Sequence, residues 1–350
     1  MTAASLARFF HIKGSEVERY YKHHLSDFKT WSQKEHATDW VLLADNLGAC
    51  CSIDETSLCN EVYTIVSNKA GHGKKGSVIA IVKGTKANVV SAVLKKIPES
   101  EREKVTEITM DFSDSMFSIA KQCFPKATIV IDCFHIVQRL CEGLEEMRLR
   151  FKRLAVTESG KEAAAFAQNE DRKAKQRAYY RKKHPRNKKE RRGRKRIRKQ
   201  TYKPTLLANG ETKVEMLTRS RNMLAQSGDK WGDSKKERAR ILFGQYPQMK
   251  EAYSLICKVR AIFKSHITRK EAKEKLHEWY KEVNACTLRE IKAARNAIKG
   301  KEEYVLNYFL NRSTNAAAES LNSKIKGFRA QLHGIADIPF FLYRVCTIFG

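Results

Sequence analysis

The chain has 350 residues, of which 42% are apolar, so it is long enough for about two domains with a real hydrophobic core. Its 68 Lys and Arg residues exceed its 39 Asp and Glu residues and leave a formal net charge of +29, which favours an acidic polymer as partner. No apolar run approaches the ~18 residues that span a bilayer, and Lys13 and Glu16 interrupt the first segment before a secretory signal forms, which excludes a membrane-spanning protein and favours an intracellular one.

Residues 1–45 are predicted to form a helical lead-in or linker. Val17, Tyr20 and His24 follow a helical spacing, and a short apolar patch follows at Trp40 to Leu43.

From residue 49 the pattern changes to short strands and then to alternating helices and strands. We expect strands over 49–53, 61–67, 76–83, 105–110 and 127–131, and helices over 85–97, 113–123 and from Cys133 onward. Three hairpin-connected strands followed by right-handed crossovers give a mixed five-stranded sheet with helices on both faces. The sequence therefore predicts an α/β fold with the topology of RNase H.

Residues 142–309 show helical periodicity, as in Tyr253, Ile256 and Val259, and are predicted to be an all-α insertion. Within it, residues 172–203 contain 18 Lys and Arg against a single acid, Glu190. Such a run is either a solvated loop or a surface for nucleic-acid phosphates, and we favour phosphate binding without sequence specificity. The residues expected to bind DNA are Arg181, Lys182, Lys183, Arg186, Lys188, Lys189, Arg191, Arg192, Arg194, Lys195, Arg196, Arg198 and Lys199.

Two aspartates lie on strands that neighbour each other in this topology. Asp54 follows the first predicted strand, and its neighbour Glu55 points to the opposite face, so only one of the two can join a site on that face. Asp111 lies at the carboxyl end of the fourth strand, where it can approach Asp54.

A third acid lies near the C-terminus, on a helix whose polar face carries Glu319, Asn322 and Lys326. Three carboxylates from separate elements are what two Mg²⁺ ions require, because hard cations take oxygen ligands and keep positions open for water and phosphate. Taken alone, each acid is more often a turn former, a cap or an exposed helical residue than a metal ligand, and the strand order, the spacing and the basic background favour the shared site.

Three segments, residues 105–113, 123–137 and 315–326, together resemble the DDE transposases of bacterial insertion sequences, most closely the ISL-three group. The resemblance covers roughly residues 45–350. It implies an RNase H-like catalytic domain that a helical insertion interrupts between the second Asp and the Glu.

The resemblance implies that Asp54, Asp111 and Glu319 are the catalytic acids and hold two Mg²⁺ or Mn²⁺ ions. For the second acid Asp132 is an alternative, because Asp132 and His135 form an Asp-x-x-His motif at the end of the fifth strand. If Asp111 is the ligand, Asp132 and His135 support the site, or His135 is simply a structural residue at a helix start. Asn322 and Lys326 are then candidates for contacts to the scissile strand.

The expected domains are a lead-in over 1–45, a catalytic core over 46–141, a basic helical insertion over 142–309 and the rest of the core over 310–350. The resemblance implies a DNA transposase that works in the bacterial cytoplasm, at the nucleoid, as a homo-oligomer on double-stranded transposon ends and target. Residues 1–45 contain no Cys, unlike the zinc-binding module of many relatives. End recognition then falls to the insertion or to a separate protein, or the copy is incomplete. The alternatives are a catalytically inactive transposase-derived nucleic-acid-binding protein and a nuclease on the same fold.

Overall fold

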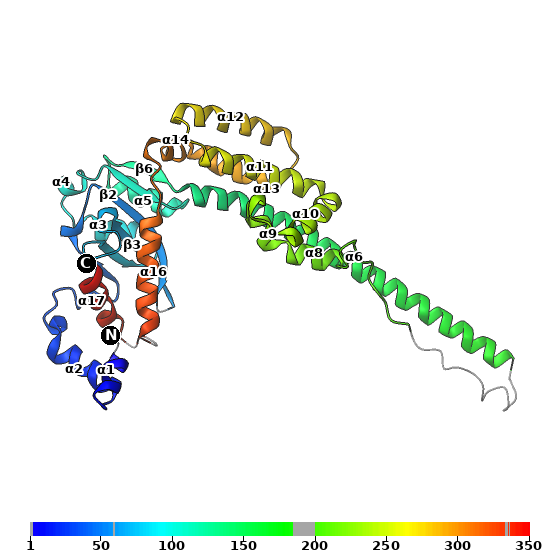
Figure 1. Ribbon diagram of the computed structural model, residues 1–350, viewed down its shortest axis with the longest axis horizontal. Coiled ribbons are helices and arrows are strands. Elements are labelled where there is room, and N and C mark those ends of the chain that lie inside the picture. Colours follow the sequence, from blue (N-terminus) through cyan, green and yellow to red (C-terminus); the bar gives the residue numbers. More distant parts are fainter. Residues whose placement is uncertain (1–2, 59, 185–199, 333–334, 336) are drawn as a thin grey trace. The chain divides into compact units, whose positions relative to one another are not determined.

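The computed structural model describes residues 3–58, 60–184, 200–332, 335 and 337–350. The chain forms two compact units, coloured along the sequence in Figure 1. The first unit comprises residues 1–136, 265–276 and 298–350, and the second comprises 137–264 and 277–297. The domain boundaries given above stay predictions, since a compact unit is not by itself a domain that folds alone.

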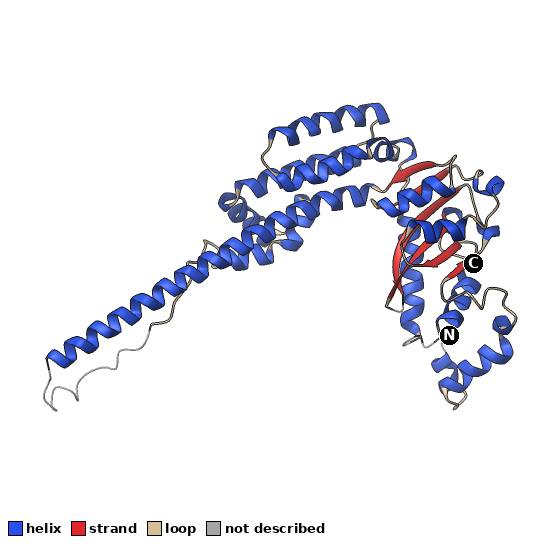
Figure 2. Cartoon of the chain, turned by 180° about the vertical axis from the view of Figure 1, so that it is seen from behind, coloured by secondary structure: helices blue, strands red, loops and turns tan. Residues whose placement is uncertain are grey.

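The first unit is built on a mixed sheet, and the strands of the described residues all lie in this unit (Figure 2). The strands are β1 (Trp40–Leu42), β2 (Cys50–Leu58), β3 (Glu61–Asn68), β4 (Val78–Lys83), β5 (Glu107–Met110) and β6 (Thr128–Ile131). Their order across the sheet is β1-β4-β3-β2-β5-β6. β1, β4, β3 and β2 pair antiparallel, whereas β2, β5 and β6 pair parallel. The RNase H-like α/β class is confirmed.

Two details of the sheet differ from the sequence prediction. A sixth strand, β1, lies in the segment predicted to be helical, because its central Val41 is fully buried opposite Ile81 of β4. The side chain of Gln33 donates to the backbone carbonyl of Leu42 at 2.8 Å and accepts from the backbone N–H of Leu42 at 2.7 Å. Two hydrogen-bonding groups of this edge strand therefore have partners. β2 also continues past residue 53 to Leu58, because its polar second half pairs along β3.

Helices cover both faces of the sheet. α16 (Ala316–Gln331) and α17 (Ile338–Phe349) bury Leu321 and Phe341 against Ile65 and Ile81. Since side chains alternate along a strand, Val66 points to the opposite face of the sheet from Ile65. On that face α3 (Ala87–Leu94) contacts β4, α5 (Asp114–Cys123) contacts β5, and the two helices contact each other. The catalytic candidates are therefore expected on one defined face.

The remaining helices of the first unit are short. They are α1 (Ala3–Phe9), α2 (Gly14–Tyr20), a π-helical turn (Tyr21–Leu25), α4 (Glu99–Arg102), α14 (Glu302–Leu306) and α15 (Tyr308–Asn311). The lead-in is thus helical over its first part, and it packs on α17, as the edge-to-face contact of Phe28 with Phe340 at 5.1 Å shows.

The described residues of the second unit contain helices and no strand, which agrees with the predicted helical character of this part of the sequence. Its elements are α8 (Lys213–Arg219), α9 (Arg221–Ala225), α10 (Asp233–Gln245) and α11 (Pro247–Lys264), with parts of α6 (Cys133–Lys183), α12 (Arg269–Ala285) and α13 (Arg289–Gly300). The Trp279 side chain is buried and its indole N–H donates to the carbonyl of Leu255 at 3.0 Å. No helix in the described part of the chain is long and apolar enough to cross a membrane.

A buried carboxylate ties the loop before α8 to two helices of this unit. Glu211 is 5% exposed and pairs with Arg238 at 2.8 Å and with Arg219 at 2.9 Å. Hydrogen bonds from Arg238, and then from Arg219 and Asn209, outweigh burial and lower the pKa of Glu211 to about 2. Because the folded pKa is depressed, the carboxylate stabilises the unit above the unfolded pKa of about 4.3, and this contribution is lost as the pH falls toward 2.

We expect Glu211→Gln to lower the free energy of unfolding by about 2–3 kcal/mol at neutral pH, because both arginines lose a buried anionic partner. The difference from the wild type should shrink as the pH falls from 5 toward 2. Urea unfolding followed by circular dichroism at several pH values measures both effects. The exposed Glu237, paired with Arg240 at 2.7 Å, provides the control, since Glu237→Gln should cost under about 1 kcal/mol. Equal stability of Glu211→Gln and wild type at neutral pH would contradict this expectation.

Candidate active site

Asp54 lies in the middle of β2, on the face of the sheet that α16 covers. It is paired in register with Ile65, and cross-strand partners point to the same side. The Asp54 side chain is nearly buried, at 8% exposure. Its Oδ2 accepts from the Nδ2 of Asn322 on α16 at 2.6 Å, and its Oδ1 accepts from the backbone N–H of Glu55 at 2.7 Å. Glu55 itself is exposed, consistent with the predicted opposite orientation.

Asp111 follows directly after β5 and comes beside Asp54. The parallel pairing of β2 and β5 places Ile53 opposite Met110, so the next residues of both strands are neighbours on the α16 face. Asp111 Oδ1 lies 2.9 Å from the Nε2 of His135 and accepts from the Nδ2 of Asn315 at 2.9 Å. The structure thus brings together two of the predicted catalytic acids.

Negative charge accumulates where these two carboxylates meet. Burial, and next the charge of Asp111, raise the pKa of Asp54 to about 7, although the hydrogen bonds from Glu55 and Asn322 and the charge of His135 oppose the rise. Burial disfavours the imidazolium of His135, but the hydrogen bond and charge of Asp111 outweigh it and raise the pKa of His135. The pKa values of Asp54 and His135 are both raised, as expected at a site with excess negative charge.

Asp132 has a different environment. It lies at the residue before α6, is 3% exposed, and its Oδ1 accepts from the backbone N–H of Phe134 at 2.7 Å as an N-cap. Its Oδ2 accepts from the backbone N–H of Asn315 at 2.6 Å. Because both oxygens hold backbone donors, Asp132 joins the start of α6 to the start of α16 and is poorly placed to accept a further ligand.

Asn315 is a site residue to which the sequence interpretation gave no role. It is fully buried, and its Nδ2 donates to Asp111 and also to the carbonyl of Ile53 at 3.3 Å. Its Oδ1 lies 3.4 Å from the hydroxyl of Thr109. The signal for it was available, since an Asn directly before a helix is a frequent cap, but a cap does not by itself indicate contact with a distant strand.

The segment that leads into α16 is anchored on β5. Glu107 is buried and pairs with Lys69 at 3.0 Å, and it also accepts hydrogen bonds from Asn311 and Ser313. Burial raises the pKa of Glu107, but the hydrogen bonds of Ser313, Asn311 and Lys69 outweigh it and lower that pKa. These bonds connect residues 311–313 to β5, the strand that directly precedes Asp111, and so position α16 over the site.

Glu319 lies on α16 between the two asparagines that contact the aspartates. Asn315, Glu319 and Asn322 are spaced by four and three residues, and so share one helical face. The Glu319 side chain is exposed, and in the described part of the chain no three His, Cys, Asp or Glu side chains are grouped closely enough to hold a metal. Lys326, one further turn along, is exposed as well. The structure therefore brings Asp54 and Asp111 together and leaves Glu319 at the edge of the site.

Only part of the predicted DNA-binding run is described. Arg181, Lys182 and Lys183 are exposed at the end of α6, as a phosphate-binding surface requires. The other predicted residues, Arg186, Lys188, Lys189, Arg191, Arg192, Arg194, Lys195, Arg196, Arg198 and Lys199, lie outside the described residues.

The fold and the site define an RNase H-like protein, with one acid on β2, a second directly after the adjacent parallel strand β5, and a helix bearing a third acid across them. A family model described as "Transposase", that of the DDE transposases of the ISL-three group, matches residues 51–345. The chain belongs to this transposase family, and the matched region includes Asp54, Asp111 and Glu319. No curated protein and no solved structure matches the chain.

Proposed function

We propose that the protein is a DNA transposase of an insertion sequence that cleaves DNA strands and joins them to a target in a metal-dependent reaction. Family membership supports transposition. The observation that carries the chemistry is the pair of adjacent carboxylates, Asp54 and Asp111, on the sheet face beneath α16. A buried acid beside a second, half-buried one serves no evident structural purpose, because each raises the energy of the other's charged form.

The donor set fits Mg²⁺ or Mn²⁺. Carboxylate oxygens are the ligands that these hard cations take, and the raised pKa of Asp54 indicates negative charge that a cation compensates. Asp54, Asp111 and Glu319 would hold two ions, with Glu319 turning inward from its exposed position on α16. When bound, such ions activate a water or 3′-hydroxyl for attack on a phosphodiester and stabilise the leaving 3′ oxygen.

The surrounding residues hold the acids in place. Asn322 fixes Asp54 and His135 fixes Asp111, so neither carboxylate rotates freely. Asp132 and Asn315 connect the helix of Glu319 to the helix of His135, and act as positioning residues. Lys326 lies one turn beyond Asn322 on the exposed face of α16, where it can contact phosphates of the scissile strand.

The partners that follow are double-stranded transposon ends and target DNA. The basic run that includes Arg181, Lys182 and Lys183 supplies sequence-independent phosphate contacts. Two ends must be held together, so we infer a homo-oligomer on DNA, with end recognition supplied by the chain or by a separate protein. The cytoplasm, at the nucleoid, is the corresponding location.

A second candidate function is that of an inactive, transposase-derived nucleic-acid-binding protein. The exposed position of Glu319 and the absence of a three-ligand metal cluster among the described residues favour it. It predicts DNA binding with steep salt dependence and no strand cleavage.

Incubation of the full chain with DNA that carries its own coding sequence and flanks separates the two functions. We expect breaks at discrete positions in both flanks, and joined products with a target plasmid, in Mg²⁺ or Mn²⁺ but not in EDTA. DNA binding without any cleavage in either ion would overturn the proposed activity and leave the inactive binding protein.

A further inference from the structure

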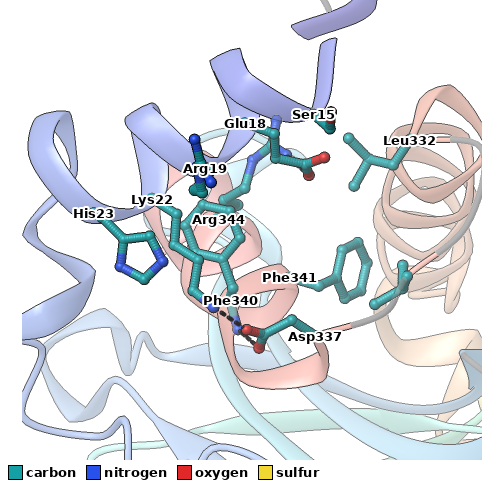
Figure 3. A pocket seen from close by; sticks show the side chains of 11 residues that line it. Ser15, Glu18, Arg19, Lys22, His23, Leu332, Asp337, Phe340, Phe341 and Arg344 are labelled. Atoms are coloured by element: carbon teal, nitrogen blue, oxygen red, sulfur yellow. Dashed lines mark hydrogen bonds and ion pairs between the residues drawn. The ribbon is translucent and has the colours of Figure 1, made fainter. Parts of the chain in front are cut away.

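A cleft lies between the N-terminal helices and α17, within the first unit and away from the paired aspartates. Figure 3 shows its walls: Glu18, Arg19 and Lys22 from α2 and the π-helical turn on one side, and Asp337, Phe340 and Arg344 on the other. Its volume is about 680 Å³, and an adjoining cavity of about 1000 Å³ shares Glu18, Arg19, His23 and Arg344 and adds Lys29 and His24. The matched family region begins at residue 51, so it includes the α17 wall of the cleft but not the wall formed by the N-terminal helices.

Arg344 is held rigidly at the wall that both cavities share. Its guanidinium lies 4.8 Å from the ring centre of Phe328, 5.8 Å from that of Phe340 and 5.9 Å from that of Tyr21. Such cation–π contacts restrict the guanidinium, and its N–H groups can still donate to an oxygen anion. The nearest acid, Glu18, is 3.9 Å away, at the limit of an ion pair.

The cations of the cleft exceed its acids. Lys22 is matched by Asp337, with which it forms an ion pair. Arg19 and Lys29 are exposed, and neither forms an ion pair with an acid of the described residues. Arg19, Lys29 and Arg344 therefore present positive charge to the two cavities, in which Glu16 and Glu18 are the acids that compete for it.

The pKa of His23 is consistent with the same excess of positive charge. Desolvation, and then the charges of Lys22, Lys29, His24 and Arg19, lower the pKa of His23 below its ordinary value. The π-helical turn of residues 21–25 places these groups together, and such turns are frequent at functional sites. A bound anion would relieve this repulsion.

We infer that the cleft binds backbone phosphates of the DNA on which the protein acts, with Arg344 as the fixed contact and Arg19 and Lys29 as the flanking ones. Two adjoining cavities that share Arg344 can each bind one of two successive phosphates of a DNA strand. Several separated cations bind an extended polyanion more tightly than they bind a single small anion. The inference rests on the proposed DNA-directed function, and it adds a DNA contact in the lead-in, separate from the basic run of the helical unit.

The test is the salt dependence of DNA binding, measured by fluorescence anisotropy on a labelled duplex between about 50 and 300 mM NaCl. The full chain carries Asp54→Asn throughout, so that cleavage does not disturb the equilibrium. Arg19→Gln and Lys29→Gln should each weaken binding several-fold and reduce the slope of log K against log salt by about 1. Arg344→Gln should do the same, and the two exposed variants keep the test valid if Arg344→Gln folds poorly.

Lys104→Gln is the matched control, because it removes one exposed cation, 69% exposed, from another part of the first unit. Slopes for Arg19→Gln and Lys29→Gln that equal that of Lys104→Gln would overturn the inference. Competition by poly-glutamate as effective as that by DNA of equal charge would instead assign the cleft to an acidic protein, and would also overturn it. A wild-type chain that binds DNA through this cleft but cleaves none would refute the proposed activity, and the inference that the cleft binds DNA would still hold.

Discussion

Replacing Asp111 by Asn is expected to lower Mg²⁺-dependent strand cleavage by about a thousandfold or more. A metal site contributes several kcal/mol of transition-state stabilisation, and about 4 kcal/mol corresponds to a factor of 10³. The substitution keeps the size of the side chain and one acceptor for His135 and Asn315, so folding and DNA binding should remain. Asp54→Asn should behave in the same way. Cleavage of end-labelled DNA, with anisotropy for binding, measures both properties.

Asp132→Asn is the matched comparison at the neighbouring acid. Its two oxygens hold the backbone N–H groups of Phe134 and Asn315, so loss of one acceptor should cost about 1–3 kcal/mol of stability. Cleavage should fall less than in Asp111→Asn and should recover at lower temperature, where the fold is retained. Full cleavage by Asp111→Asn together with loss in a stably folded Asp132→Asn would transfer the ligand role to Asp132.

Glu319→Gln is expected to reduce cleavage as severely as Asp111→Asn, although the Glu319 side chain is exposed. It shares the face of α16 with Asn315 and Asn322, and these two residues already touch Asp111 and Asp54. Because residues of one metal site act as a unit, the double variant Asp111→Asn/Glu319→Gln should be little worse than either single variant.

Glu55→Gln provides the control for Glu319. Glu55 is the other acid beside Asp54, is also exposed, and points away from the α16 face. The rate of DNA cleavage by Glu55→Gln should stay within about threefold of the wild-type rate, because surface substitutions away from a site have small effects. Wild-type cleavage by Glu319→Gln, or equal losses in Glu319→Gln and Glu55→Gln, would remove Glu319 from the proposed site.

The sequence predicted the fold class and the neighbourhood of Asp54 and Asp111, because strand order and alternation decide which side chains meet. It did not predict β1, since three apolar residues carry no period and the strand exists only through its pairing with β4. The polar end of β2 was missed for the same reason, because register along β3 extends it to Leu58.

The connections that hold α16 over the sheet were also not predicted. The contacts of Asn315 with Asp111 and Asp132 join residues that are about two hundred positions apart, and no local pattern encodes such a pairing. The preference for Asp111 over Asp132 as ligand, made from strand order alone, gains a physical argument from the two backbone donors that Asp132 already holds, and it stays a prediction.

The central claim is that Asp54, Asp111 and Glu319 share divalent metal ions. A crystal of the full chain bound to cleaved end DNA in Mn²⁺, with an anomalous difference map at the manganese edge, tests it most directly. We predict manganese peaks within about 2.5 Å of carboxylate oxygens of Asp54 and Asp111, with Glu319 turned inward to the same ions. A map without manganese at the two aspartates, in crystals that contain bound DNA and millimolar Mn²⁺, would contradict the account.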